Sequence, residues 1–155
     1  MTELQPLLTL LGQAERERDV ALAHSQRQDA ALRAAQAQAE QLLDYRRDYE
    51  QRWGEHFSRQ SKIELLHCYQ GFIQRLSQAI DQQAHAAGRA ADQAAVALAA
   101  LREADMRVAS VRKLIERRVG EQQRSEEKRD QKQTDEFAAR VVWRRPSSFG
   151  SLSAR

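Results

Sequence analysis

Apolar residues recur at every seventh position through most of the second half of the chain. The series that begins at Leu66 contains only apolar residues: Leu66, Ile73, Ile80, Ala87, Ala94, Leu101, Val108 and Ile115. A companion series three residues later is apolar except at one glutamine: Tyr69, Leu76, Gln83, Ala90, Ala97, Ala104 and Val111. Alternating steps of three and four residues form the a/d pattern of a coiled coil. The pattern predicts one long amphipathic helix.

The first half of the chain carries the same repeat in a weaker form. Its a-type series reads Leu4, Leu11, Arg18, Ser25, Leu32, Ala39, Arg46 and Trp53, and its d-type series reads Leu7, Ala14, Ala21, Gln28, Ala35, Leu42, Tyr49 and His56. Polar residues interrupt both series, but the spacing persists. A second long helix with a narrower apolar stripe is therefore predicted.

The phase of the repeat changes between Trp53 and Ser61, which indicates a turn. Ser61 and Glu64 have the spacing of a capping box at the start of a helix. No proline lies between Pro6 and Pro146, so long uninterrupted helices are permitted. We expect helix 1 at about 3–56, a turn at about 57–61 and helix 2 at about 62–143.

A short turn between two long helices makes them antiparallel neighbours. The predicted fold class is all-α: a long two-helix antiparallel coiled-coil hairpin, formed as one domain over residues 1–145. Because helix 2 is much longer than helix 1, residues 116–145 should form a C-terminal helix overhang. Residues 146–155, four of which are serine, are expected to be a disordered tail.

The composition agrees with a helical chain and argues against an enzyme. Alanine, arginine and glutamine number 25, 21 and 19, whereas Leu, Ile, Val and Phe together number 31 of 155 residues. A sheet-containing domain would need more β-branched and aromatic residues. No glycine-rich phosphate loop is present, and the four histidines are dispersed. We therefore expect no catalytic residues, no cofactor and no metal.

Charge and cysteine usage bound the location and the partners. Residues 1–111 carry 13 basic and 15 acidic side chains (−2), whereas residues 112–155 carry 12 and 7 (+5). The basic end favours an acidic partner, or serves only solubility. A single cysteine, Cys68, is typical of a reducing compartment. No apolar run approaches the roughly 20 residues of a membrane helix, so a cytoplasmic protein without direct membrane insertion is expected.

Aromatic and apolar residues also extend beyond the predicted seam on one edge of the hairpin. Tyr45 in helix 1 and Phe72 in helix 2 both occupy position g and are equidistant from a turn near residue 58. Two helices cannot bury all of these side chains, which indicates a protein-binding surface. The alternative is that they only thicken a weak core near the turn.

The overhang is mainly polar and ends in an apolar segment with Phe137, Val141, Val142 and Trp143. A polar single helix is either a bridging element or one that awaits a partner. The alternative is a frayed, charged helix. Its basic residues could contact phosphates, but the interleaved acidic residues argue against nucleic-acid binding.

Several segments in order resemble one known family, the flagellar export protein FliJ. They are Leu42, Tyr45 and Tyr49; the run Tyr69–Leu76 with Ile80 and Gln83; Leu114 and Glu116–Arg118; and the run from Gln131 to Arg140, which is similar to the family's C-terminal signature. The resemblance covers about residues 1–142.

The resemblance implies a non-enzymatic stalk, similar to the central stalk of rotary ATPases. It implies the hexameric export ATPase FliI, its regulator FliH, the gate protein FlhA and the export chaperones FlgN and FliT as partners. It also implies a cytoplasmic protein peripherally associated with the inner-membrane export apparatus. A hairpin that buries its own seam should be monomeric. By similarity, the gate-contacting residues are Gln38, Leu42, Tyr45, Tyr49, Phe72, Leu76 and Ala79. The end that holds both termini would enter the ATPase ring, with candidate contacts at Glu116, Arg117, Arg118, Lys132, Asp135, Glu136 and Arg140.

Three other functions stay open on the sequence. The chain could be the equivalent stalk of a virulence-type secretion system, with the same architecture. It could be a coiled coil that binds nucleic acid through residues 112–145, in which case binding would fall steeply with salt. It could also be a generic dimeric scaffold, which a measurement of molecular mass in solution would reveal.

Overall fold

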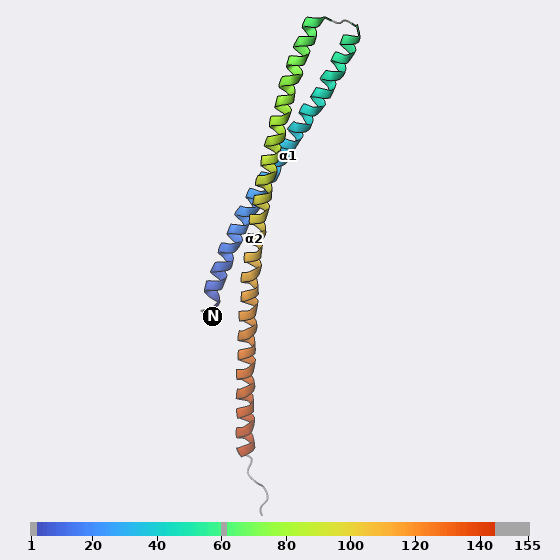
Figure 1. The fold of residues 1–155 in the computed structure, drawn as a ribbon. Helices are drawn as coiled ribbons and strands as arrows, with labels where there is room; N and C mark the ends of the chain where they lie inside the picture. Colours follow the sequence, from blue (N-terminus) through green and yellow to red (C-terminus); the bar gives the residue numbers. More distant parts are fainter. Residues whose placement is uncertain (1–2, 60–61, 145–155) are drawn as a thin grey trace, which may run out of the picture. The chain divides into compact units, whose positions relative to one another are not determined.

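The computed structural model describes residues 3–59 and 62–144, and almost all of them are helical. Helix α1 spans Leu4–Arg59 and helix α2 spans Ile63–Arg144 (Figure 1). The two helices pack against each other, and the described residues contain no strand, so the predicted all-α helical hairpin is confirmed. The expected tail, residues 146–155, lies outside the described residues.

Contacts divide the chain into two compact units. Unit 1 combines Met1–Leu11 with Ala109–Arg155, and unit 2 is Gly12–Val108. Unit 2 holds most of α1, the connection and the first half of α2, and is a helical hairpin in itself. Unit 1 pairs the first turns of α1 with the second half of α2.

The helix boundaries lie close to the predicted ones, with one difference at the connection. α1 continues to Arg59, three residues beyond the expected end at residue 56. Phe57 is half-buried and lies 5.1 Å from Trp53 and 5.5 Å from Tyr69 between ring centroids, so the last turn gains packing by staying helical. The hydroxyl of Ser58 donates to the carbonyl of Glu55 at 2.7 Å.

The capping box expected at the start of α2 depends on Ser61, which lies outside the described residues. In the described part, the backbone N–H of Leu66 donates to the carbonyl of Lys62 at 3.2 Å, so Lys62 already accepts a helical hydrogen bond. At the other terminus, Pro6 falls in the first turn of α1, where a missing N–H removes no helical hydrogen bond.

Burial within the two units follows the predicted heptad positions closely. Apart from two residues beside the connection, every a and d residue of the series is buried or half-buried. The most deeply buried are mostly small: Ala14, Leu76, Ala97, Ala104, Val108 and Val111. The polar a residues Arg18 and Arg46 keep their place in the seam, because a long arginine stem can lie along apolar surface while its guanidinium reaches water.

The two exceptions are His56 and Leu66, both of which are exposed. Their places are taken by the neighbouring residues Phe57 and Leu65, which are half-buried. The seam therefore shifts by one residue on each helix near the connection, at the point where the sequence shows a change of phase.

Gly88 offers a test of whether the helical glycines are needed. A Cβ built on Gly88 meets no atom within 4 Å. Because glycine in a helix interior costs stability through backbone entropy, Gly88→Ala should raise the free energy of unfolding by about 0.5–1 kcal/mol. Urea unfolding followed by circular dichroism measures this change. An unchanged or lower urea midpoint would show that something other than a steric clash with the added methyl group disfavours alanine at position 88.

Candidate functional site

The aromatic residues near the connection form one continuous cluster across the two helices of unit 2. Tyr49 lies at its centre: its ring centroid is 4.3 Å from that of Phe72 and 5.8 Å from those of Tyr69 and Trp53. We call the six rings the aromatic cluster: Tyr45, Tyr49, Trp53, Phe57, Tyr69 and Phe72. Such contacts add specific aromatic attraction to the apolar area that they bury.

The cluster divides into a packed part and an exposed part. Tyr49, Trp53, Phe57, Tyr69 and Phe72 are half-buried. Tyr45 remains 53% exposed, although its ring lies 6.3 Å from Phe72 in an edge-on arrangement. Most of the rings therefore thicken the core near the turn, while Tyr45 presents an aromatic face to solvent; binding of a protein at this face stays a prediction.

The environment of Tyr69 reflects its packed position. Partial burial, then the negative charge of Glu50 and the neighbouring Tyr49, raise the pKa of the Tyr69 hydroxyl above its usual value of 10.0. Tyr69 therefore stays neutral at physiological pH and acts as a packing residue.

The seven residues implied as gate contacts lie in unit 2, four of them on α1 and three on α2. The structure brings the residues of the two helices together along one edge. Leu76 is buried, Leu42 and Ala79 are half-buried, and Gln38 is exposed. A surface groove continues from Tyr45 and is lined by Gln38, Gln41, Leu42, Tyr45 and Gln83. An aromatic face at one end and an amide-lined groove beside it make this edge suitable for a partner with an apolar anchor.

Gln83 joins the two helices at this groove. Its side-chain amide donates to the carbonyl of Ala35 at 3.1 Å and to the Oε1 atom of Gln38 at 3.1 Å. A polar residue at a seam position with a partner on the opposite helix favours one register over its neighbours. The hydrogen bonds hold α1 and α2 in the alignment that places Tyr45 beside Phe72.

The sequence did not identify two features of this edge. Trp53 and Phe57 belong to the aromatic cluster, and Gln41 lines the groove. Trp53 stands in the a series, so its inward position could be inferred. Phe57 and Gln41 depend on the local shift of the seam and on the width of the groove, which a periodic pattern does not contain.

The candidate ATPase contacts all lie on α2 within unit 1 and are all exposed. The structure does not gather them into one cluster, because two groups, at 116–118 and 132–140, are separated along the helix. At 100° per residue, Arg118, Lys132, Glu136 and Arg140 share one face. Arg117 and Asp135 fall to one side of this face, and Glu116 falls on the opposite side. Arg118 is also committed to an ion pair with Glu3 at 3.6 Å.

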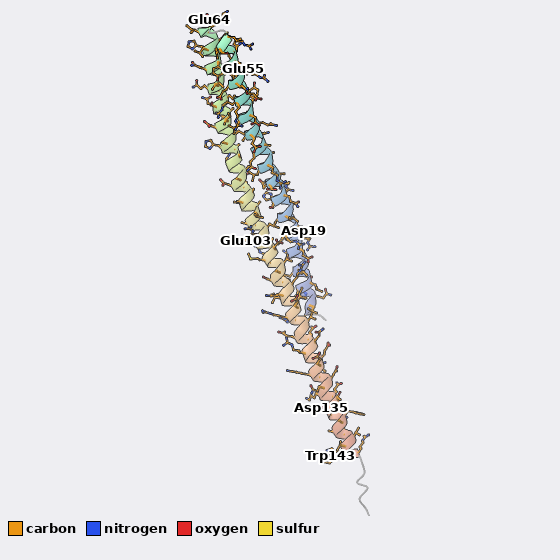
Figure 2. The ribbon with its side chains drawn as sticks, turned by 90° about the vertical axis from the view of Figure 1, so that its right-hand side faces the viewer. Asp19, Glu55, Glu64, Glu103, Asp135 and Trp143 are labelled. Atoms are coloured by element: carbon orange, nitrogen blue, oxygen red, sulfur yellow. The ribbon has the colours of Figure 1, made fainter. Side chains whose placement is uncertain are left out.

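The end of α2 extends beyond the residues of α1 that belong to the same unit. From Gln123 to Arg144 every residue is exposed. Figure 2 shows Asp135 and Trp143 on a stretch with no other part of unit 1 alongside. Phe137, Val142 and Trp143 are 70%, 70% and 90% exposed, so the apolar segment predicted at the end of the helix is bare. We call Gln123–Arg144 the bare helix.

Other chemistry receives no support from the described residues. Within residues 3–59 and 62–144, no three His, Cys, Asp or Glu side chains are grouped as a metal site requires. Neither described helix has a stretch apolar enough to cross a membrane.

The fold defines an all-α helical hairpin protein, with an aromatic cluster in unit 2 and a bare helix in unit 1. A family comparison is more specific: the model described as flagellar FliJ protein matches residues 2–147. The chain therefore belongs to the FliJ family, whose members are non-enzymatic components of the export apparatus, and is a component related to flagellar protein export. A search of curated proteins found no match.

Proposed function

We propose that this chain is the stalk of the flagellar type III export apparatus and couples the export ATPase ring to the membrane export gate. The observation that supports this role most directly is the bare helix in unit 1. A helix of that kind gains little stability from its own chain and is suited to insertion into a partner. The bare helix is about 33 Å long at 1.5 Å per residue.

The proposed partners are those that the resemblance to the family implies. The bare helix and the candidate contacts around it would enter the hexameric ATPase FliI, whose regulator FliH would be a further partner. The edge with Tyr45 and Phe72 would contact the cytoplasmic part of FlhA, and the chain would also escort the export chaperones FlgN and FliT. The protein would act as a cytoplasmic monomer, peripherally associated with the inner-membrane apparatus, and ATP hydrolysis would be performed by the ATPase.

The ATPase contact is tested by making the apolar end of the bare helix acidic. The full chain is expected to co-purify with its cognate ATPase, promote hexamer formation and stimulate ATP hydrolysis. Phe137→Asp with Val141→Asp should reduce that stimulation at least 10-fold, because two buried charges in an apolar contact are strongly unfavourable. The hydrolysis rate is measured at saturating ATP with increasing amounts of the chain.

The matched control is Met106→Asp, which changes another exposed apolar residue, 62% exposed, in unit 2. This variant should stimulate the ATPase like the wild-type chain. Equal loss in both variants, or no stimulation by the wild-type chain, would contradict the proposed ATPase contact.

A further inference from the structure

A second surface groove lies on the same edge of unit 2 as Tyr45 and Phe72. It is lined by His24, Gln28, Asp92, Gln93 and Val96. The g positions on α1 lead to it from Tyr45 in three steps of seven residues, through Gln38 and Ala31 to His24. The two grooves are thus successive parts of one surface, about 30 Å long at 1.5 Å per residue.

Glutamine side chains recur along this surface. We call the five of them the glutamine track: Gln28, Gln38, Gln41, Gln83 and Gln93. A glutamine amide can both donate and accept hydrogen bonds. Since the Nε2 atom of Gln83 already donates to Ala35 and Gln38, Gln83 offers an occupant its Oε1 atom, and Gln38 offers its Nε2 atom. An extended peptide has free backbone N–H and C=O groups that match such a track, whereas the backbone groups of a helix already bond to one another. The chemistry of the track therefore favours an extended occupant over a helical one.

The charges along this edge are almost all positive. Between Tyr45 and Val20 on α1, and between Phe72 and Val96 on α2, the c and g positions carry three charged residues, Arg27, Arg75 and Arg89. All three are exposed, and within the described ranges none of them takes part in an ion pair. The Nε atom of Arg75 donates to the carbonyl of Gly71 at 3.3 Å. Asp92, at position f, supplies the one carboxylate of the second groove, so the surface has a net charge of +2.

The opposite edge of the same hairpin differs. Over the same length its b and e positions carry Asp29, Glu40 and Asp81 against Arg33, a net charge of −2. Its arginines are also engaged, since Arg33 pairs with Asp29 at 2.9 Å and Arg47 with Asp44 at 3.6 Å. Between Val20 and Tyr45 on α1 and between Phe72 and Val96 on α2, the unpaired arginines at these flanking positions therefore lie on the edge that carries the glutamine track.

We propose that this edge binds an extended, acidic peptide segment of a partner protein. An aromatic or aliphatic side chain of the segment packs against Tyr45 and Phe72, its backbone bonds to the glutamine track, and its carboxylates face Arg27, Arg75 and Arg89. Charge complementarity identifies the chemistry of the occupant. The inference rests on the proposed role of the edge as a partner-binding surface, and it extends that surface by two heptads, to His24 and Val96.

The test is to pan a library of random 16-residue peptides against the full chain. Enriched peptides should carry net negative charge and at least one aromatic or large aliphatic residue. The affinity of an enriched synthetic peptide should fall at least 10-fold between 50 and 300 mM salt. Enrichment of neutral or basic peptides, or no enrichment, would overturn the proposal.

Two matched triple variants locate the binding surface. Arg27→Glu, Arg75→Glu and Arg89→Glu together should weaken the enriched peptide at least 10-fold, because they reverse the charge of the edge. Arg33→Glu, Arg47→Glu and Arg102→Glu make the same change in net charge on the opposite edge and should alter the affinity less than 2-fold. Circular dichroism checks that both variants keep their helix content. Equal losses in both would refute the assignment to this edge.

A proline scan of the enriched peptide distinguishes an extended from a helical occupant. Proline disrupts a helix interior but is compatible with an extended chain. We expect several interior positions to tolerate proline, and a loss at every interior position would refute the extended mode.

The gate assignment is tested separately. If the variant with Arg27, Arg75 and Arg89 replaced by Glu binds the gate protein as well as the wild-type chain does, the gate does not bind as an acidic peptide. If the wild-type chain binds acidic peptides but not the gate protein, the proposed gate contact is wrong and the peptide-binding surface stands.

Discussion

Replacing Tyr49 with alanine should lower the free energy of unfolding by about 3 kcal/mol. Tyr49 contacts rings on both helices, with Phe72 at 4.3 Å and Tyr69 and Trp53 each at 5.8 Å between centroids. Removing a large ring from such a cluster loses its transfer free energy and leaves a cavity that cannot fully close. Urea unfolding monitored by circular dichroism measures the effect.

Two further variants separate packing from other effects. Tyr49→Phe keeps the ring and should change stability by less than about 0.5 kcal/mol, in the range of a surface substitution. Tyr45→Ala removes a ring that is 53% exposed, and should cost about 1 kcal/mol. If Tyr45→Ala were as destabilising as Tyr49→Ala, the division of the cluster into packed and exposed parts would be wrong.

Replacing Tyr45 and Phe72 together with alanine should weaken binding to the cytoplasmic part of the export gate at least about 30-fold, the effect of removing one hot-spot residue. Tyr45 supplies the exposed aromatic face, and Phe72 supports it from α2 at 6.3 Å. Isothermal titration calorimetry with purified gate domain measures the affinity. Helix content should be unchanged, because both substitutions leave the helical backbone intact.

Trp53→Ala is the control for this experiment. Trp53 belongs to the aromatic cluster and packs on Tyr49, Phe57 and Tyr69, but it is not among the implied gate contacts. It should reduce stability while leaving gate affinity within about 3-fold, a difference well below that of a hot spot. An equal loss of affinity in both variants would mean that the cluster matters for folding only and would remove the gate assignment.

The seam was predictable from the sequence because a heptad repeat reports the geometry of a single helix. Residues seven apart lie on nearly the same face of a helix, so each a and d series marks one stripe whatever its partner is. The prediction held even where the residue type argued against it, as at Arg18 and Arg46, which are half-buried in the seam. It failed at His56 and Leu66, where the connection shifts the seam by one residue.

The candidate site was predictable only in part. The g positions of Tyr45 and Phe72 follow from the repeat, and the structure places the two rings beside each other. Tyr49 is less exposed than Tyr45 because two rings of α2, Tyr69 and Phe72, pack against Tyr49, whereas only Phe72 of α2 has a ring contact with Tyr45 among the described residues. Likewise, Gln83 appears in the sequence as an interruption of the d series, whereas in the structure it bonds to Ala35 and Gln38 across the seam.

The sequence by itself therefore determined the two long helices, the stripe on which each is buried and the excess length of the second helix. These features depend on backbone geometry and on the spacing of apolar residues along one helix. Only the tertiary structure decided which rings pack together, where the grooves lie and which arginines remain without an acidic partner. Those features depend on the stagger and rotation of one helix against the other, which arise from contacts between residues far apart in the chain.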